Sequence, residues 1–118
     1  MIDKLKQYEV AWARFVEWII DKGYKTDKYF IYATVDGIDG LNYIISDYEL
    51  YGLCIEWLDS KRIYLTITSY YDYWIWLILK KEEIDYRIPF EEKLSSRTEA
   101  TEAGIIKGFE ILNNQKEK

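Results

Sequence analysis

The chain has few side chains that could carry out catalysis. It contains no histidine, which excludes the serine–histidine and cysteine–histidine pairs of covalent catalysis. Its one cysteine, Cys54, lies between Leu53 and Ile55, where a buried and unreactive thiol is expected. Adjacent carboxylates at residues 82–83 and 91–92 have the chemistry of an acid–base pair, but they occur in charged segments typical of a solvated surface. We therefore expect no enzymatic activity.

Metal and cofactor sites are also poorly supported by the sequence. Residues 36–42 (DGIDGLN) resemble a calcium loop only superficially, because they lack the D-x-D-x-D-G spacing and the closing glutamate. A plain turn is the preferred interpretation. No glycine-rich phosphate loop is present, and without histidine the commonest metal ligand is missing. We expect neither a metal nor a cofactor.

Aromatic side chains are the most distinctive feature of the composition, at 18% of the residues, with twelve tyrosines and five tryptophans. Residues 69–76 (SYYDYWIW) concentrate them at an expected strand-to-strand turn. Tyrosine and tryptophan provide large contact areas at low entropic cost and are common in antibody-type binding surfaces. We predict a protein-binding surface or a homodimer contact here, and packing beneath the helices is the structural alternative. The predicted contact residues are Tyr70, Tyr71, Tyr73 and Trp74.

The net charge is −5, and the acidic excess lies mainly in the middle of the chain. Between residues 27 and 59 the only basic side chain is Lys28, against Asp27, Asp36, Asp39, Asp47, Glu49, Glu56 and Asp59. Such a charge distribution repels nucleic acid and attracts basic protein surfaces. The acids predicted to steer a partner are Asp36, Asp39, Asp47 and Glu49.

Nucleic-acid binding is one alternative function. A helix–meander–helix order can mimic the double-stranded-RNA-binding fold, in which lysines at the start of the second helix contact phosphates. Here residues 97–102 (RTEATE) carry one base and two acids. Tyrosines can stack on single-stranded bases, but affinity depends mainly on phosphate neutralisation. The candidate contacts are Lys61, Arg62, Lys80 and Lys81.

The elements that would position these residues begin with a helix over residues 3–22. Apolar residues recur there at three- and four-residue spacing. Asp3 is the expected N-cap, and Gly23 suits the left-handed residue that ends a helix. Residues 28–35 favour a strand, 36–40 a turn and 41–45 a short second strand.

Alternating apolar residues predict further strands from residue 50 onward. Leu53, Ile55 and Trp57 indicate a strand that reaches residue 58, followed by a turn at 59–61. Residues 63–68 form the next strand, 69–72 a turn, and 73–79 a strand that is apolar on both faces and is therefore central or covered on both sides. After a charged turn at 80–83, residues 86–88 are a candidate edge strand that ends at Pro89.

The last predicted element is a helix that begins at a capping box formed by Ser96 and Glu99. Gly104 and Gly108 lie four residues apart in it and cost about 1 kcal/mol each, which is explained by close packing against the aromatic sheet. Residues 113–118 are expected to be a frayed tail. The sequence thus predicts one α+β domain over residues 1–118, with an N-terminal helix, an antiparallel meander of three to five strands, and a C-terminal helix packed on one sheet face.

Residues 95–100 (SSRTEA), followed by Ala103, Lys107 and residues 110–112, resemble the ending of many small proteins encoded by bacteriophages and prophages. In these proteins aromatic-rich strands lead into an SRTEA capping box and a final amphipathic helix. The end of the first helix, residues 21–24, looks similar to theirs too. Small acidic phage proteins often look like inhibitors of host defence, including anti-CRISPR proteins. The resemblance implies an accessory protein that binds and inhibits a host protein, such as a CRISPR nuclease or its guide complex.

The expected location is the host bacterial cytoplasm. A single cysteine fits a reducing compartment, no run of 18 apolar residues predicts a membrane span, and the N-terminus lacks the apolar core of a signal peptide. Three functions remain open: the inhibitor of a host protein, a single-stranded RNA or DNA binder, and a self-assembling structural phage protein that uses the aromatic turn as a dimer contact.

Overall fold

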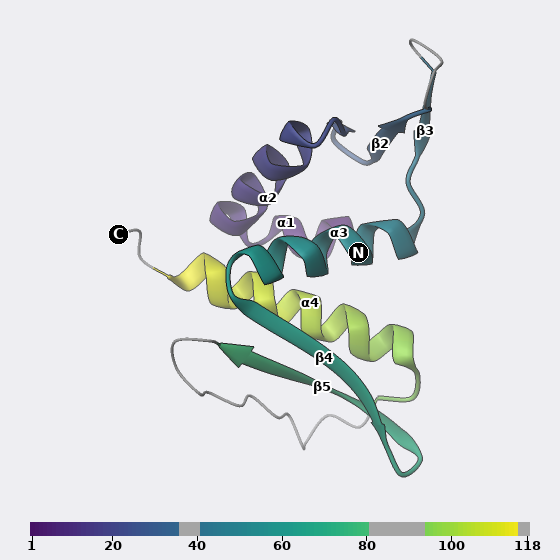
Figure 1. Ribbon diagram of the computed structural model, residues 1–118, viewed down its shortest axis with the longest axis vertical. Coiled ribbons are helices and arrows are strands. Elements are labelled where there is room, and N and C mark those ends of the chain that lie inside the picture. Colours follow the sequence, from purple (N-terminus) through teal and green to yellow (C-terminus); the bar gives the residue numbers. More distant parts are fainter. Residues whose placement is uncertain (36–40, 81–93, 116–118) are drawn as a thin grey trace.

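The computed structural model describes residues 1–35, 41–80 and 94–115. Within these residues four helices and five strands form an α+β fold (Figure 1), which confirms the predicted fold class. The order is α1 (Ile2–Lys6), α2 (Glu9–Asp21), β1 (Lys25–Thr26), β2 (Ile31–Thr34), β3 (Asn42–Ile44), α3 (Asp47–Ser60), β4 (Ile63–Tyr70), β5 (Tyr73–Lys80) and α4 (Arg97–Asn114). The turn predicted at 36–40, the strand at 86–88 and Pro89 lie outside the described residues, as does the turn predicted at 80–83 except for Lys80, which ends β5.

The N-terminal helix is interrupted at residues 7–8 and forms α1 and α2. Gly23 has φ +99°, as predicted for the residue that ends α2. The predicted N-cap is wrong, because Asp3 lies within α1 and Met1 occupies the capping position. The start of α2 is capped from the far end of the chain: the Asn113 side-chain oxygen accepts hydrogen bonds from the backbone N–H groups of Val10 (2.9 Å) and Ala11 (3.2 Å). The predicted tail is wrong for residues 113 and 114, which belong to helix α4, and residues 116–118 lie outside the described part of the chain.

The strand predicted over residues 50–58 is wrong, because these residues belong to helix α3. The Ser46 hydroxyl accepts a hydrogen bond from the Glu49 backbone N–H over 3.2 Å and caps the helix. Leu50, Leu53 and Trp57 recur at three- and four-residue spacing, and all three are buried. The predicted meander is consequently divided into a β1-β2-β3 sheet and a separate β4–β5 hairpin.

The two predicted strands on either side of the aromatic turn are confirmed as β4 and β5, paired antiparallel from Ile63–Lys80 to Tyr70–Tyr73. Helix α4 packs on this hairpin and, with its other sides, contacts α2 and α3 (Figure 1). The predicted close packing against the sheet is confirmed for Gly104, whereas Gly108 packs against Leu58 of helix α3. A Cβ atom on Gly104 would lie 2.5 Å from a methyl carbon of Leu65, and one on Gly108 would lie 2.7 Å from a methyl carbon of Leu58.

The predicted cap of α4 is confirmed in one half and altered in the other. The Ser96 hydroxyl accepts from the Glu99 backbone N–H over 3.1 Å. The Glu99 carboxylate, however, accepts from the backbone N–H (3.0 Å) and the hydroxyl (2.9 Å) of Ser95. These hydrogen bonds lower the pKa of the Glu99 carboxyl.

The core centres on three rings contributed by three helices. Phe15 from α2, Trp57 from α3 and Phe109 from α4 have ring centroids 5.0 to 5.5 Å apart, in tilted and edge-to-face arrangements. These geometries are favourable for aromatic pairs. The three helices therefore converge on one aromatic cluster, which leaves β2 and β3 at the edge of the fold. No helix in the described part of the chain is long and apolar enough to span a bilayer.

Candidate protein-binding site

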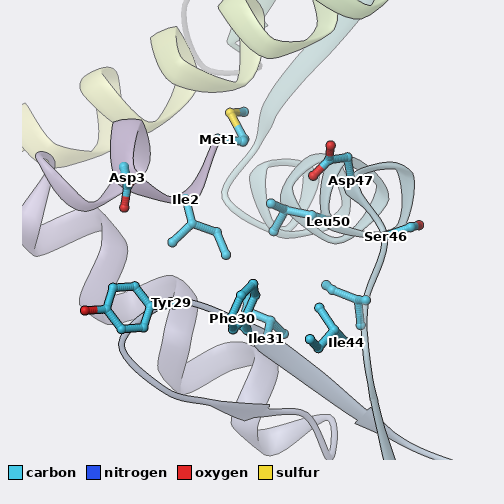
Figure 2. Close-up of a pocket in the computed structure, with 11 residues that line it drawn as sticks. Met1, Ile2, Asp3, Tyr29, Phe30, Ile31, Ile44, Ser46, Asp47 and Leu50 are labelled. Carbon is cyan, nitrogen blue, oxygen red and sulfur yellow. The ribbon is translucent and has the colours of Figure 1, made fainter.

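A half-open cleft of about 390 Å³ lies where α1, the β1–β2 turn, the end of β3 and the start of α3 meet (Figure 2). Cavities of this size are in the range of ligand-binding pockets. The cleft is lined by Met1, Ile2, Asp3, Tyr29, Phe30, Ile31, Ile44, Ile45, Ser46, Asp47 and Leu50. Three separate segments of the chain, residues 1–3, 29–31 and 44–50, thus form one concave surface.

The apolar side chains of the cleft fall into a buried floor and an exposed border. Ile31 and Leu50 are almost fully buried. Tyr29, Phe30 and Ile44 are 62%, 44% and 52% exposed, although each is large and apolar. Exposed apolar side chains that gather around one concavity are typical of interaction sites, unlike those scattered singly. We call the cleft and these three bordering residues the cleft surface.

Asp27 holds the aromatic residues of the cleft surface in place. One carboxylate oxygen accepts from the backbone N–H groups of Tyr29 and Phe30, both over 2.8 Å. The other accepts from the Tyr32 hydroxyl over 2.6 Å. The hydrogen bond from Tyr32, followed by those from the two backbone groups, lowers the pKa of the Asp27 carboxyl, and the same bond raises the pKa of Tyr32. A hydrogen bond also connects the β1–β2 turn to α1, because the Lys6 ammonium donates to the backbone carbonyl of Lys28.

Carboxylates form the polar part of the cleft. Asp3 and Asp47 line it, and no lysine or arginine occurs among its lining residues in the described part of the chain. Glu49 lies two residues after Asp47 in α3, and its carboxylate accepts a hydrogen bond from the Tyr43 hydroxyl over 3.2 Å. Acids in the first turn of a helix are stabilised by the helix dipole. Both predicted steering residues Asp47 and Glu49 are exposed, but only Asp47 lines the cleft, while Asp36 and Asp39 lie outside the described residues.

The predicted aromatic turn is exposed only in part. Tyr71 is 87% exposed and has φ 57°, an uncommon backbone conformation for a tyrosine. Tyr73 and Trp74 are half-buried. Trp74 is held by backbone hydrogen bonds with Leu94, and the Arg97 guanidinium lies 6.0 Å from its ring centroid. Of Tyr70 only the backbone is described. The prediction that some rings face outward therefore applies most clearly to Tyr71.

The aromatic turn and the cleft surface do not form one continuous site. The β2–β3 strands and the β4–β5 turn lie at opposite ends of the longest molecular axis, which measures 47 Å (Figure 1). The predicted aromatic anchors belong to the β4–β5 turn and the predicted acids Asp47 and Glu49 to the first turn of α3, and α4 lies between these two elements in Figure 1.

The basic residues proposed for nucleic-acid contact lie elsewhere again. Lys61 follows α3, Arg62 has φ 64°, and β4 then begins at Ile63, opposite Lys80. Lys61, Arg62 and the backbone of Lys80 therefore share one end of the hairpin, and Lys81 lies outside the described residues. Three basic positions at one end of a hairpin form a small cluster compared with the extended basic surface that neutralises phosphates in nucleic-acid-binding proteins.

Cys54 is fully buried, as predicted, although it belongs to a helix and not to a strand. Burial raises the pKa of its thiol, which keeps the sulfur protonated and unreactive. The carboxylate pairs at 82–83 and 91–92 lie outside the described residues.

The cleft surface was not among the predicted sites. One local signal for it is present in the sequence, because Asp27 precedes Tyr29 and Phe30 at the spacing of an aspartate turn. That signal predicts the turn but not the cleft, which depends on where α1 and α3 pack. Searches against protein-family models, curated proteins and solved structures found no match to this chain.

Proposed function

We propose that this chain is a protein-binding module and that its cleft surface is the contact site. The observation that supports the proposal is the grouping of Tyr29, Phe30 and Ile44, all exposed, around a cleft bordered by carboxylates. Large apolar and aromatic side chains that fill or border pockets contribute most of the binding free energy in protein interfaces. The partner accordingly has an apolar protrusion next to a basic surface.

The acids would act mainly on the rate of association. Charged residues at the border of an interface steer the encounter more than they hold the complex. Asp47→Asn and Glu49→Gln together are expected to slow association and to reduce its dependence on salt, with a smaller effect on dissociation. Surface plasmon resonance at two salt concentrations measures both rates.

A more specific form of the proposal is an inhibitor of a host protein. It rests on the resemblance of residues 95–100 to phage proteins and on the acidic middle of the chain. An acidic surface can compete with nucleic acid for the basic channel of a nuclease or of its guide complex. Adding this chain to the purified partner tests the inhibitor proposal, since nuclease activity should fall as the complex forms.

Affinity capture with paired variants tests the site. The bait proteins are the unmodified chain, Phe30→Gln at the cleft surface and Tyr71→Gln at the aromatic turn, with bound bacterial proteins quantified by mass spectrometry. Loss of a central apolar contact is expected to cost about 2 kcal/mol, roughly a thirtyfold increase in Kd. The partner should therefore be retained by Tyr71→Gln and depleted with Phe30→Gln.

Two other capture results would contradict the proposed contact site or the proposed function. Depletion with Tyr71→Gln alone would move the contact site to the predicted anchors at the aromatic turn. Absence of any captured protein, at both low and moderate salt, would contradict protein binding as the function. Both substituted side chains are exposed, so both variants are expected to fold, and circular dichroism of each bait checks this.

A further inference from the structure

The hydrogen bonds on the inner side of β3 define the direction of its backbone groups. Strand β3 is an outer strand of the sheet, whose order is β1-β2-β3. The Val35 N–H donates to the Leu41 carbonyl over 2.9 Å, and the Ile45 N–H donates to the Ile31 carbonyl over 3.0 Å. Hydrogen-bonded and non-hydrogen-bonded residue pairs alternate along an antiparallel ladder. The pairs 35–41 and 31–45 are therefore hydrogen-bonded pairs.

This alternation determines which residues of β3 face outward. Asn42 lies opposite Thr34, and Ile44 lies opposite Tyr32. Both pairs fall one residue away from a hydrogen-bonded pair and are therefore non-hydrogen-bonded pairs. The backbone N–H and C=O groups of Asn42 and Ile44 consequently point away from β2, toward the open edge.

The open edge of β3 lacks the usual protection. Proteins block such edges with charged residues, proline, bulges or a covering element. Strand β3 reads Asn42-Tyr43-Ile44, all exposed and none of them charged or proline. Among the described elements its backbone lies close to that of β2 alone, and the hydrogen bond from the Tyr43 hydroxyl to Glu49 connects it to α3 through a side chain. The other edge strand, β1, is two residues long, begins with Lys25 and contacts α2. The sheet is thus protected at one edge and open at the other.

Side chains beside the open edge indicate what would pair with it. The Tyr43 hydroxyl reaches the Glu49 carboxylate, so an acid lies on the face of β3 to which Tyr43 points. Ile44 projects from the opposite face and is 52% exposed. Cross-strand neighbours are most favourable when they are opposite in charge or both apolar. A complementary strand therefore places a basic side chain on the Tyr43 face and an apolar side chain on the Ile44 face.

We propose that β3 binds an extended segment of the partner protein as an added strand, in which Lys or Arg residues alternate with apolar residues. The backbone of the segment pairs with Asn42 and Ile44, its basic side chain lies beside Glu49, and its apolar side chain packs on Ile44. A second copy of this chain fits the edge less well, because pairing through β3 would bring two acidic Glu49 regions together. The inference rests on the proposed protein-binding function and adds the mode of binding and the chemistry of the bound segment.

Peptides selected from a displayed random library on the immobilised chain provide the probe. The substitution Asn42→Pro removes one outward N–H, while the backbone hydrogen bonds to β2 come from other residues of the ladder. The matched control is Asn42→Thr, which loses the same side-chain amide and keeps the backbone N–H. We expect the selected peptides to alternate basic and apolar residues and to bind Asn42→Pro about tenfold more weakly than Asn42→Thr. Glu49→Gln is also expected to weaken their binding.

Amide chemical shifts in ¹⁵N-labelled unmodified protein locate the peptide and do not depend on any variant folding. Shifts that centre on Asn42 and Ile44 support strand addition. Peptides that bind both Asn42 variants equally, with shifts at the cleft lining instead, overturn strand addition and leave the proposed function standing. Dimers of the chain that form with rising concentration and are abolished by Asn42→Pro assign the edge to a second copy and overturn the proposal. Failure to enrich any peptide also overturns strand addition. The affinity capture with paired variants tests the proposed protein-binding function separately.

Discussion

Two glycines in helix interiors are expected to respond to alanine with opposite signs. Replacement of glycine by alanine inside a helix is intrinsically favourable by about 1 kcal/mol. At Gly52 in α3 an added Cβ would meet nothing within 4 Å, so Gly52→Ala should stabilise the chain by about 0.5 to 1 kcal/mol. At Gly108 in α4 the same Cβ would lie 2.7 and 2.9 Å from the two methyl carbons of Leu58. No real Cβ contact is so short, so something must move.

The cost at Gly108 follows from the burial of its neighbour. Leu58 is fully buried, so its methyl groups cannot turn aside into solvent. Overpacking of a buried site costs about 1 to 3 kcal/mol, which exceeds the helical gain of about 1 kcal/mol. We therefore expect Gly108→Ala to lower the free energy of unfolding by as much as about 2 kcal/mol. Urea denaturation followed by circular dichroism measures the change.

A double-mutant cycle with Leu58→Ala isolates the steric contribution. The shortened side chain of Leu58→Ala removes both methyl contacts, so adding Gly108→Ala in that background should be stabilising. If Gly108→Ala stabilises the otherwise unmodified chain as much as Gly52→Ala does, then α3 and α4 do not pack as closely as the structure has them, and the argument fails.

Three further perturbations test other contacts. Tyr51→Phe removes the hydrogen bond from the partly buried Tyr51 hydroxyl on α3 to Glu102 on α4 and should cost about 1 to 2 kcal/mol. Tyr48→Phe changes an exposed side chain on the same helix and should cost almost nothing. Burial and the bond to Glu102 raise the pKa of Tyr51, so the unmodified chain should lose stability as the pH rises above about 10, and the Tyr51→Phe variant should lose less. Urea denaturation at neutral and alkaline pH compares the two proteins. Equal losses of stability would contradict the role of the Tyr51 hydroxyl. Asn113→Ala should cost about 1 kcal/mol by uncapping α2, with faster hydrogen exchange at the Val10 and Ala11 amides; unchanged exchange there would refute the cap. Tyr32→Phe should raise the depressed pKa of Asp27, as followed by ¹³C NMR of its carboxyl, and a constant value would show that the Tyr32 hydrogen bond is unimportant.

The elements with clear local signals were predictable. The β4–β5 hairpin followed from alternation on either side of its turn, and the end of α2 followed from Gly23. Helix α3 was misassigned because Leu53, Ile55 and Trp57 fit a period of two, while Leu50, Leu53 and Trp57 fit a helix equally well. A signal that decides between them was present, since Ser46 and Glu49 have the capping-box spacing that correctly predicted α4.

The cleft surface could not be predicted from local patterns. Tyr29 and Phe30 belong to a run that reads as a strand, but the hydrogen bonds from their backbone N–H groups to the Asp27 carboxylate place them in a turn. Asp47 was predicted from its charge, but the apolar cleft beside it is formed only where α1, the β1–β2 turn and the segment from the end of β3 to the start of α3 come together. Sites built from several distant segments depend on tertiary packing, which periodicity does not specify.

The Asn113 cap has a consequence for the order of folding. The amides of Val10 and Ala11 at the start of α2 receive their acceptor from a residue that follows Ala11 by 102 positions. During synthesis the first long helix therefore emerges with these amides solvated, and their native partner arrives only with the final turns of α4. Contacts of such long sequence separation slow folding, because a large loop must close first. Helix α4 thus supplies the cap of α2, and a ribosome-bound chain that ends before Asn113 can form α2 but cannot cap it in this way.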